Sequence, residues 1–124
     1  MSDDTRHRLG ARGEELAAQH LERLGFEILQ RNFRTRWGEL DLVALGDRTL
    51  VFCEVKTRRQ GGSAGTALEA LSLRKRQRIR RLAGMWLSQH PAVPRAKAIR
   101  CDLIAITFDR AESLLSLDHV VSAF

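Results

Sequence analysis

Apolar residues recur at helical spacing in two segments of the chain. In residues 5–24, the side chains of Ala17, Leu21 and Leu24 lie on one helical face, and the next residue is a glycine, which often ends a helix. Residues 66–89 carry a longer stripe, and a proline stands just beyond its end. That stripe consists of Leu68, Leu71, Ile79, Leu82, Ala83 and Trp86. The two patterns predict one helix near the start of the chain and a longer one in its second half.

The remaining apolar runs are short and bounded by turn residues, as expected of strands. They occupy residues 26–33, 38–45, 49–57 and 96–108. The second and third form a predicted hairpin with "GDR" at its turn, and residues 114–124 suggest an additional edge strand. Residues 58–66 contain three glycines and suit an irregular connection. The order α-β-β-β-α-β, with or without the last strand, predicts an α/β domain whose mixed sheet is flanked by helices.

Length and composition suit one domain over residues 1–124, because 44% of the 124 residues are hydrophobic. The first ten residues contain acids and no apolar run, unlike a signal peptide. No window approaches the roughly 18 apolar residues of a membrane span. Cys53 and Cys101 belong to no CxxC pair, and they suit buried thiols in a reducing compartment; a disulfide between them is the alternative. We therefore expect a cytoplasmic protein without a membrane segment.

The chain is basic. Its 21 Lys and Arg residues exceed its 15 Asp and Glu residues, which gives a net charge of +6. The densest run is "RKRQRIRR" at residues 74–81, which has six basic residues in eight, and further arginines flank the predicted hairpin. Such a surplus favours a polyanionic partner such as nucleic acid, bound through its phosphates. The alternative is a helix face that is simply solvated.

Three carboxylates and a lysine interrupt the predicted hairpin. Glu39 and Asp41 alternate on one face of the first arm, and Glu54 and Lys56 share a face of the second. A turn of two or four residues would bring both sets to one side of the sheet, with Asp41 within reach of Glu54, whereas a three-residue turn with a bulge would shift them. The opposite face would carry only apolar residues, namely Leu40, Leu42, Ala44, Val51, Cys53 and Val55.

Such a carboxylate cluster is electrostatically costly. Two carboxylates about 4 Å apart repel each other by roughly 4 kcal/mol at an effective dielectric constant near 20. The cluster must therefore take up a proton, stay hydrated or hold a cation. A solvated ion-pair ladder on the surface is the simpler interpretation, but three acids and one lysine match it poorly.

Each predicted helix adds one charged residue to its apolar stripe. Glu14 precedes Ala17, Leu21 and Leu24 at helical spacing, so it points from the first helix toward the sheet. A cap or edge position is the alternative for Glu14. Lys75 interrupts the stripe of the second helix, where its ammonium group either extends to water or belongs to a site.

The sequence as a whole resembles a known family. The stretches "GARGEELAAQHLERLGFEILQRNFRTRWGELDLVAL", "LVFCEVKTR", "RCDLIAI" and "HVVSAF" resemble the bacterial YraN-like family of predicted endonucleases. That family is distantly similar to archaeal Holliday junction resolvases and belongs to the PD-(D/E)xK nuclease superfamily. Its specific motifs here are G-E-x-x-A, "RNFR", "GELD" and "EVKTR". The resemblance implies a restriction-endonuclease-like core.

The resemblance also implies site residues. Asp41 takes the place of the motif's Asp, Glu54 and Lys56 those of its E-x-K, and Glu14 that of the helix acid. The implied ligands of Mg²⁺ or Mn²⁺ are Asp41, Glu54, the Val55 carbonyl and Glu14, the last directly or through water. Lys56 would orient or deprotonate the attacking water, or stabilise charge on phosphorus. Glu39 matches the family's G-E-x-D and is an implied supporting residue, and Lys75, singled out by its place in the apolar stripe, is the other expected supporting residue. Leu40 replaces the motif's Pro, Cys101 stands where the family often has Phe, and the glycine-rich loop lacks a frequent aromatic residue.

The implied activity is hydrolysis of nucleic-acid phosphodiester bonds, in DNA rather than RNA and in branched or otherwise irregular structures. Nucleic-acid contacts are expected from Arg34, Arg36, Arg58, Arg74, Arg76 and Arg78. A homodimer is one implied assembly. Two alternatives stay open: a non-catalytic nucleic-acid-binding module, and a subunit that is active only with a partner.

Overall fold

The computed structural model describes residues 2–61, 72–91, 93 and 96–124, and it contains two helices and five strands within them. The elements are α1 (Asp3–Arg23), β1 (Glu27–Thr35), β2 (Gly38–Gly46), β3 (Thr49–Arg59), α2 (Leu73–Gln89), β4 (Ala98–Phe108) and β5 (Leu114–Val120). The edge strand suggested for residues 114–124 is therefore present as β5. Helix α2 begins at Leu73, because the side chain of Ser72 caps it by accepting from the Lys75 N–H at 3.1 Å. Residues 66–71, the start of the predicted helix, lie outside the described residues.

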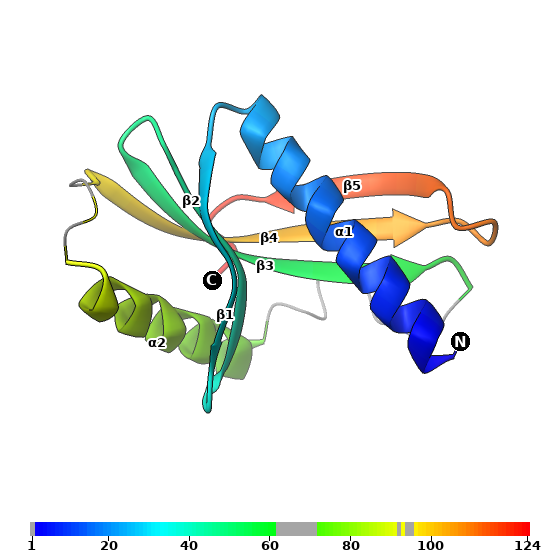
Figure 1. The fold of residues 1–124 in the computed structure, drawn as a ribbon, viewed down its shortest axis with the longest axis horizontal. Coiled ribbons are helices and arrows are strands. Elements are labelled where there is room, and N and C mark those ends of the chain that lie inside the picture. Colours follow the sequence, from blue (N-terminus) through cyan, green and yellow to red (C-terminus); the bar gives the residue numbers. More distant parts are fainter. Residues whose placement is uncertain (1, 62–71, 92, 94–95) are drawn as a thin grey trace.

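The strands form one sheet in the order β1-β2-β3-β4-β5. Only β3 and β4 pair in parallel, and the other neighbours are antiparallel, so the sheet is mixed. Figure 1 shows α1 crossing the sheet and α2 near the β1–β2 hairpin, with β1 and β2 turned steeply against β3, β4 and β5. The α/β class is confirmed, with order α-β-β-β-α-β-β, and it is consistent with the expected restriction-endonuclease-like core.

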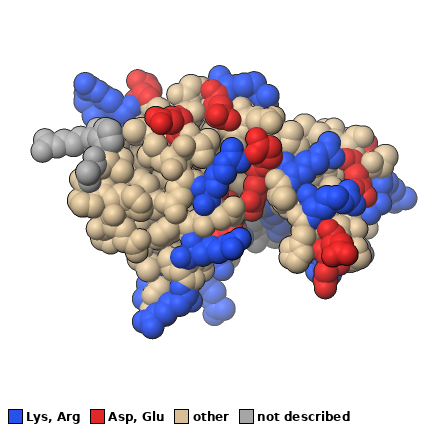
Figure 2. Space-filling model, in the orientation of Figure 1, with Lys and Arg blue, Asp and Glu red and all other residues tan. Residues whose placement is uncertain are grey.

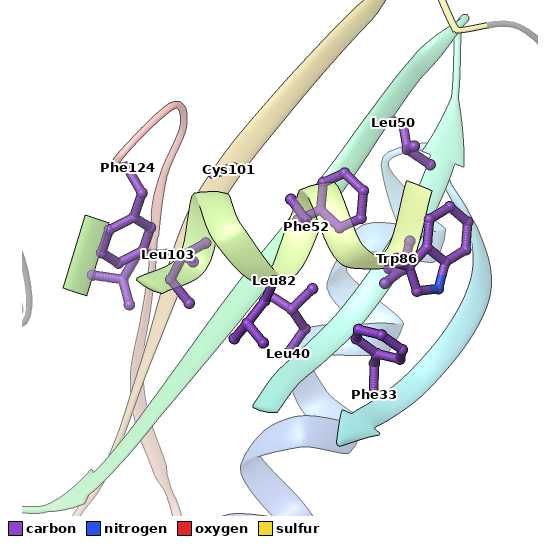
Figure 3. Close-up of a cluster of buried hydrophobic side chains, with 12 residues drawn as sticks. Phe33, Leu40, Leu50, Phe52, Leu82, Trp86, Cys101, Leu103 and Phe124 are labelled. Carbon is purple, nitrogen blue, oxygen red and sulfur yellow. The ribbon is translucent and has the colours of Figure 1, made fainter. Parts of the chain in front are cut away.

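A hydrophobic layer lies on each face of the sheet. On one face, Ile79, Leu82 and Trp86 of α2 pack against residues such as Phe52 and Leu103 (Figure 3). The other layer joins α1 to the sheet through Leu9, Ala17, Ala18, Leu21, Leu42, Ala44, Val51, Cys53, Ile104, Ile106 and Phe108. Burying each large side chain stabilises the fold by about 1.5–3 kcal/mol. The sheet is thus a middle layer, and its central strands lie between two helices.

Two further predictions concerned the state of the cysteines and the absence of a membrane-spanning helix. Cys53 and Cys101 are both buried and unpaired, so the thiol interpretation is confirmed over the disulfide. Among the described residues, no helix is long and apolar enough to cross a membrane.

The β2–β3 hairpin has a two-residue turn. Gly46 pairs with Thr49, and Asp47 and Arg48 between them have φ angles of 46° and 58°. Positive φ at both positions is typical of the type I′ turn, whose twist matches that of the flanking strands. The turn fixes the register through the last pair, Leu42 with Cys53.

The prediction that Leu40, Leu42 and Ala44 share one face of the hairpin was wrong. Leu40 packs in the α2 layer, whereas Leu42 and Ala44 pack in the α1 layer. The alternation breaks at Asp41, and across from it on β1 the residue Asn32 has a φ of 52°, which ordinary strand geometry does not allow. The local twist of both strands turns the side chains on either side of the break to different layers. This break determines where the acids of β2 point.

Candidate active site

Three carboxylates converge where α1 meets β2. One oxygen from each of Glu14, Glu39 and Asp41 lies within 4.8 Å of the other two, and all three side chains are half-buried. Glu14 reaches the sheet because its neighbour Gly13 lets α1 approach β3 closely. A Cβ atom at Gly13 would lie 2.1 Å from the Oγ1 atom of Thr57, which is far too close. A side chain at position 13 would therefore push the helix acid away from the strand acids.

Asp41 occupies the point where β2 and β3 separate. Its Oδ2 atom accepts from the backbone N–H of Val55 at 2.7 Å. This hydrogen bond lies just beyond the last paired residues of the two strands, Leu42 and Cys53. Burial raises the pKa of Asp41 to about 8, and repulsion from Glu54, Glu14 and Glu39 adds to the rise, while the Val55 N–H opposes it. The negative charge of Asp41 is therefore poorly compensated by the protein alone.

The side chain of Asn32 joins the other two acids. With its amide nitrogen turned toward them, Asn32 donates to Glu39 Oε1 at 3.0 Å and to Glu14 Oε2 at 3.2 Å. Arg34, a predicted nucleic-acid contact, donates to Glu39 Oε2 at 3.2 Å from the exposed rim. Burial and the charge of Glu39 raise the pKa of Glu14, although hydrogen bonds from Asn32 and with Asp41 oppose the rise. Hydrogen bonds thus orient the cluster without neutralising it.

Glu54 faces the other layer. It is not one of the three clustered acids; instead its Oε1 lies 3.4 Å from Lys75 Nζ, and its Oε2 lies 3.9 Å from Arg78 Nη2. The ammonium group of Lys75 is therefore paired with Glu54 in a side chain that is 24% exposed. The Oε2 atom of Glu54 is buried and accepts no hydrogen bond from the described residues. Lys56 lies two residues further along β3, so strand alternation places it on the same face as Glu54.

Hard oxygen ligands suit Mg²⁺ and Mn²⁺, so the donor set can be judged against these ions. The ionised form of Asp41 is disfavoured by the protein, and the buried Oε2 of Glu54 accepts no hydrogen bond within the part of the chain that the structure describes. Both deficits are of the kind that a bound cation removes. The residues present therefore fit a divalent ion in their chemistry.

The arginines predicted to contact nucleic acid come from several elements, among them β1, β3 and α2. Arg36 and Arg81 stack over the half-exposed ring of Trp37, at 4.7 and 3.9 Å from its centroid. Arg74 is exposed at the start of α2. Arg76 lines a separate pocket of about 430 Å³. Figure 2 shows acidic and basic side chains intermingled on the face viewed.

Comparison with known proteins places the chain in a family. Residues 13–106 match the family described as "Uncharacterised protein family UPF0102". The chain belongs to the UPF0102 family. A UPF0102 protein of Acidothermus cellulolyticus is 47% identical over 96% of this chain and 95% of its own length. UPF0102 proteins of Frankia casuarinae and a Parafrankia species are 46% and 48% identical, each over 94% of this chain, covering 95% and 96% of their own lengths.

The UPF0102 match covers the whole candidate site. Glu14, Glu39, Asp41, Glu54 and Lys56 all lie between residues 13 and 106. The family description names no activity, so the comparison shows only that the chain belongs to this family. Any reaction of the protein has to be inferred from the geometry of the site. Sequence reasoning missed two residues that shape this site, Asn32 and Gly13. Asn32 stands in the "RNFR" motif and Gly13 directly precedes the helix acid, but only the close contacts reveal what they do.

Proposed function

We propose that this UPF0102 protein is a metal-dependent endonuclease that hydrolyses phosphodiester bonds in nucleic acid. One observation carries the proposal: three half-buried carboxylates lie within 4.8 Å of one another, on a protein of net charge +6. Like charges gathered in this way are unfavourable unless a cation or protons compensate them. A site for a divalent cation on a basic protein suits a reaction whose substrate is a phosphate polyanion.

In this proposal Asp41, Glu14 and Glu39 hold Mg²⁺ or Mn²⁺, and Glu54 and the Val55 carbonyl are further ligands. When bound, such an ion supplies a Lewis acid for a phosphate oxygen and lowers the pKa of a coordinated water. The Val55 N–H holds Asp41 in place, and the Asn32 amide would do the same for the helix acid.

The lysines have separate roles in the proposed site. Lys56, on the face of Glu54, orients the attacking water, takes its proton or stabilises charge on the phosphorus. Lys75 positions Glu54, because their ion pair fixes the carboxylate of β3 against α2. Lys75 thus acts through another residue, whereas Lys56 acts on the reacting groups.

One observation favours a second function, a nucleic-acid-binding module without catalysis. Glu54 is paired with Lys75 and Arg78, and its carboxylate lies outside the three-acid group. In a binding module, these ion pairs would be structural and the basic residues of α2 would carry the affinity. The two functions differ in whether purified protein cuts its ligand.

The test is cleavage of flapped, forked, four-way, single-stranded and duplex DNA, with matched RNA strands, in Mn²⁺ and in chelator. Glu14→Gln, Asp41→Asn and Lys56→Ala should abolish cleavage and leave affinity within about threefold. Glu15→Gln is the matched control, because Glu15 is the next residue of α1 but is exposed and paired with Arg31. Cleavage that persists in Asp41→Asn and Lys56→Ala refutes the site. Binding without cleavage by the wild type supports the module, and cleavage that requires a cell-extract component supports a subunit that needs a partner.

A further inference from the structure

The turn between β1 and β2 carries an exposed tryptophan. Thr35 pairs with Gly38, so Arg36 and Trp37 are the two residues of this turn. Trp37 is 42% exposed, whereas Trp86, the other tryptophan of the chain, is buried. Within the part of the chain that the structure describes, Trp37 is the only aromatic residue among the exposed large hydrophobic ones. A single exposed hydrophobic residue is ordinary on a protein surface, so only its surroundings can indicate a ligand.

The turn that carries Trp37 rests on α2. The Thr35 hydroxyl accepts from the Trp37 N–H at 2.9 Å and donates to the Gly38 carbonyl oxygen at 3.1 Å. Gly38 has a φ of 136°, and a Cβ atom there would lie 3.3 Å from Cδ of Arg78 and 3.5 Å from Cδ1 of Leu82. The backbone of the turn is therefore held in place before any ligand binds, which limits the conformational entropy that binding removes.

Two exposed arginines lie over the ring of Trp37. The Cζ atom of Arg36 is 4.7 Å from the ring centroid, and that of Arg81 is 3.9 Å from it. Among the described residues, neither arginine forms an ion pair with an acidic side chain, whereas the nearby Arg34 is paired with Glu39. The ring thus lies beside two positive charges that no carboxylate of the described residues compensates.

A single strand of nucleic acid has the complementary chemistry, because it alternates stacking bases with phosphates. Stacking of a base on an aromatic side chain is stronger than an exposed contact between a guanidinium group and a ring. A base can therefore replace the guanidinium group of Arg36, the more distant of the two, and that group can then pair with a phosphate. A base inside a duplex has both faces covered by its neighbours. The surroundings of Trp37 thus favour an unpaired base over a duplex.

The ring also lies near the carboxylates of the candidate active site. Glu39 follows Trp37 by two residues, which span about 7 Å in an extended chain. Arg78, beside Gly38 of the turn, lies 3.9 Å from Glu54 Oε2. A base on Trp37 would therefore bring the adjoining sugar-phosphate backbone close to both sets of acids.

We propose that Trp37 is a stacking site for one unpaired base of a single-stranded segment, whose adjoining phosphates bind Arg36 and Arg81. This inference rests on the proposed function for the fate of that strand. It adds the substrate class, a nucleic acid with an unpaired nucleotide next to the bond that is cut. Every base has a face that can stack, so the identity of the base should matter little.

The first measurement is the tryptophan fluorescence of the full chain, titrated with oligothymidylate in chelator. We expect saturable quenching, because a base stacks on Trp37 while Trp86 stays buried. Trp37→Phe should bind within about threefold of the wild type, since phenylalanine also stacks on bases. The same variant should show no quenching, since it retains only Trp86.

The second measurement is the affinity for fluorescently labelled strands, by anisotropy in chelator. Trp37→Leu should bind oligothymidylate about tenfold more weakly, and should bind a base-free strand of equal length, or a duplex, like the wild type. Arg36→Gln should weaken binding of the strands with and without bases by the same factor, because it removes a phosphate contact. Leu73→Ala, at another exposed hydrophobic residue, and Arg48→Gln, at the β2–β3 turn, are the matched controls and should have smaller effects.

The stacking site would be overturned if Trp37→Leu lost the same affinity for the base-free strand or the duplex as for oligothymidylate. Absence of saturable binding, or of quenching at saturation, would overturn it as well. None of these readouts involves cleavage. A wild type that stacks the base but never cuts in Mn²⁺ would remove the proposed nuclease and keep the stacking site. Cleavage by the wild type, with unchanged oligothymidylate binding in Trp37→Leu, would do the reverse.

Discussion

Replacing Asp41 by Asn should make the metal-free protein more stable at alkaline pH. The structure raises the pKa of Asp41 from 3.8 to about 8, because the carboxylate is buried and surrounded by acids. A group whose pKa is higher in the folded than in the unfolded protein costs stability as pH rises between the two values. Asp41 therefore destabilises the fold progressively from about pH 4 to about pH 8.

The size of this effect follows from the shift. About four pKa units at roughly 1.36 kcal/mol each set an upper limit of roughly 5 kcal/mol at pH 8.5. Contact of the half-buried carboxylate with water reduces the effect, and we expect a gain of about 2 kcal/mol or more for Asp41→Asn. The Asn side chain retains an oxygen for the Val55 N–H, so the hydrogen bond that holds residue 41 is conserved.

Urea unfolding in chelator at pH 5 and pH 8.5, followed by tryptophan fluorescence, measures the difference. The advantage of the variant should be small at pH 5 and roughly threefold larger at pH 8.5. Glu15→Gln should show no such gain, because Arg31 lowers the pKa of Glu15. Mn²⁺ should stabilise the wild type, by about 2.7 kcal/mol at a hundredfold excess over Kd, and should not stabilise Asp41→Asn. A variant less stable than the wild type at pH 8.5, or an equal difference at both pH values, would refute the electrostatic reasoning.

Three further outcomes test other parts of the structure. Trp86→Ala should lower the free energy of unfolding in urea by about 3–5 kcal/mol, because Trp86 is buried. Trp37 is 42% exposed, so Trp37→Ala should lower it by about 1 kcal/mol or less. Equal losses in the two variants would contradict the assigned core. Lys75→Ala should lower the free energy of unfolding by about 1–3 kcal/mol, because among the described residues the carboxylate of Glu54 then keeps only its more distant ion pair with Arg78. An unchanged midpoint of urea unfolding would show that the ion pair contributes nothing. Burial and then neighbouring cations lower the pKa of His20 from 6.5, so the fold should lose stability as pH falls below 6.5, and His20→Gln should reduce that loss in thermal unfolding at pH 5.

The sequence predicted the elements of this fold well because their signals are local. Helical spacing located α1, and apolar runs located the strands, including the one suggested at residues 114–124. The second helix was predicted to start at residue 66; the structure describes it from Leu73, with its cap at Ser72, and residues 66–71 lie outside the described residues. A stripe indicates a face that can be buried, but the cap determines where the helix begins.

The site was harder to predict because it depends on a break in alternation. Sequence reasoning brought Asp41 and Glu14 together and recognised the two-residue turn as one option. It also put Asp41 within reach of Glu54, and the charge of Glu54 does raise the pKa of Asp41, but the prediction assumed that β2 alternates regularly throughout. Asn is among the residues that tolerate positive φ best, so Asn32 carried a weak signal for the break, but nothing in residue type indicates the reversal at Leu40. Glu14, Glu39 and Asp41 therefore cluster beside α1, while Glu54 pairs with Lys75 of α2 and still lies near enough to Asp41 to raise its pKa.

The close approach of Gly13 to Thr57 determines how far the carboxylate of Glu14 lies from the carboxylates of β2. The height of α1 above the sheet is set by the absence of a single methyl group, and the separation between the helix carboxylate and the strand carboxylates changes with that height. Gly13→Ala should therefore lower the affinity for Mn²⁺, although residue 13 has no side chain that could touch an ion. The selectivity of such a site for ions of different radius would then depend on how closely a helix backbone rests on a threonine.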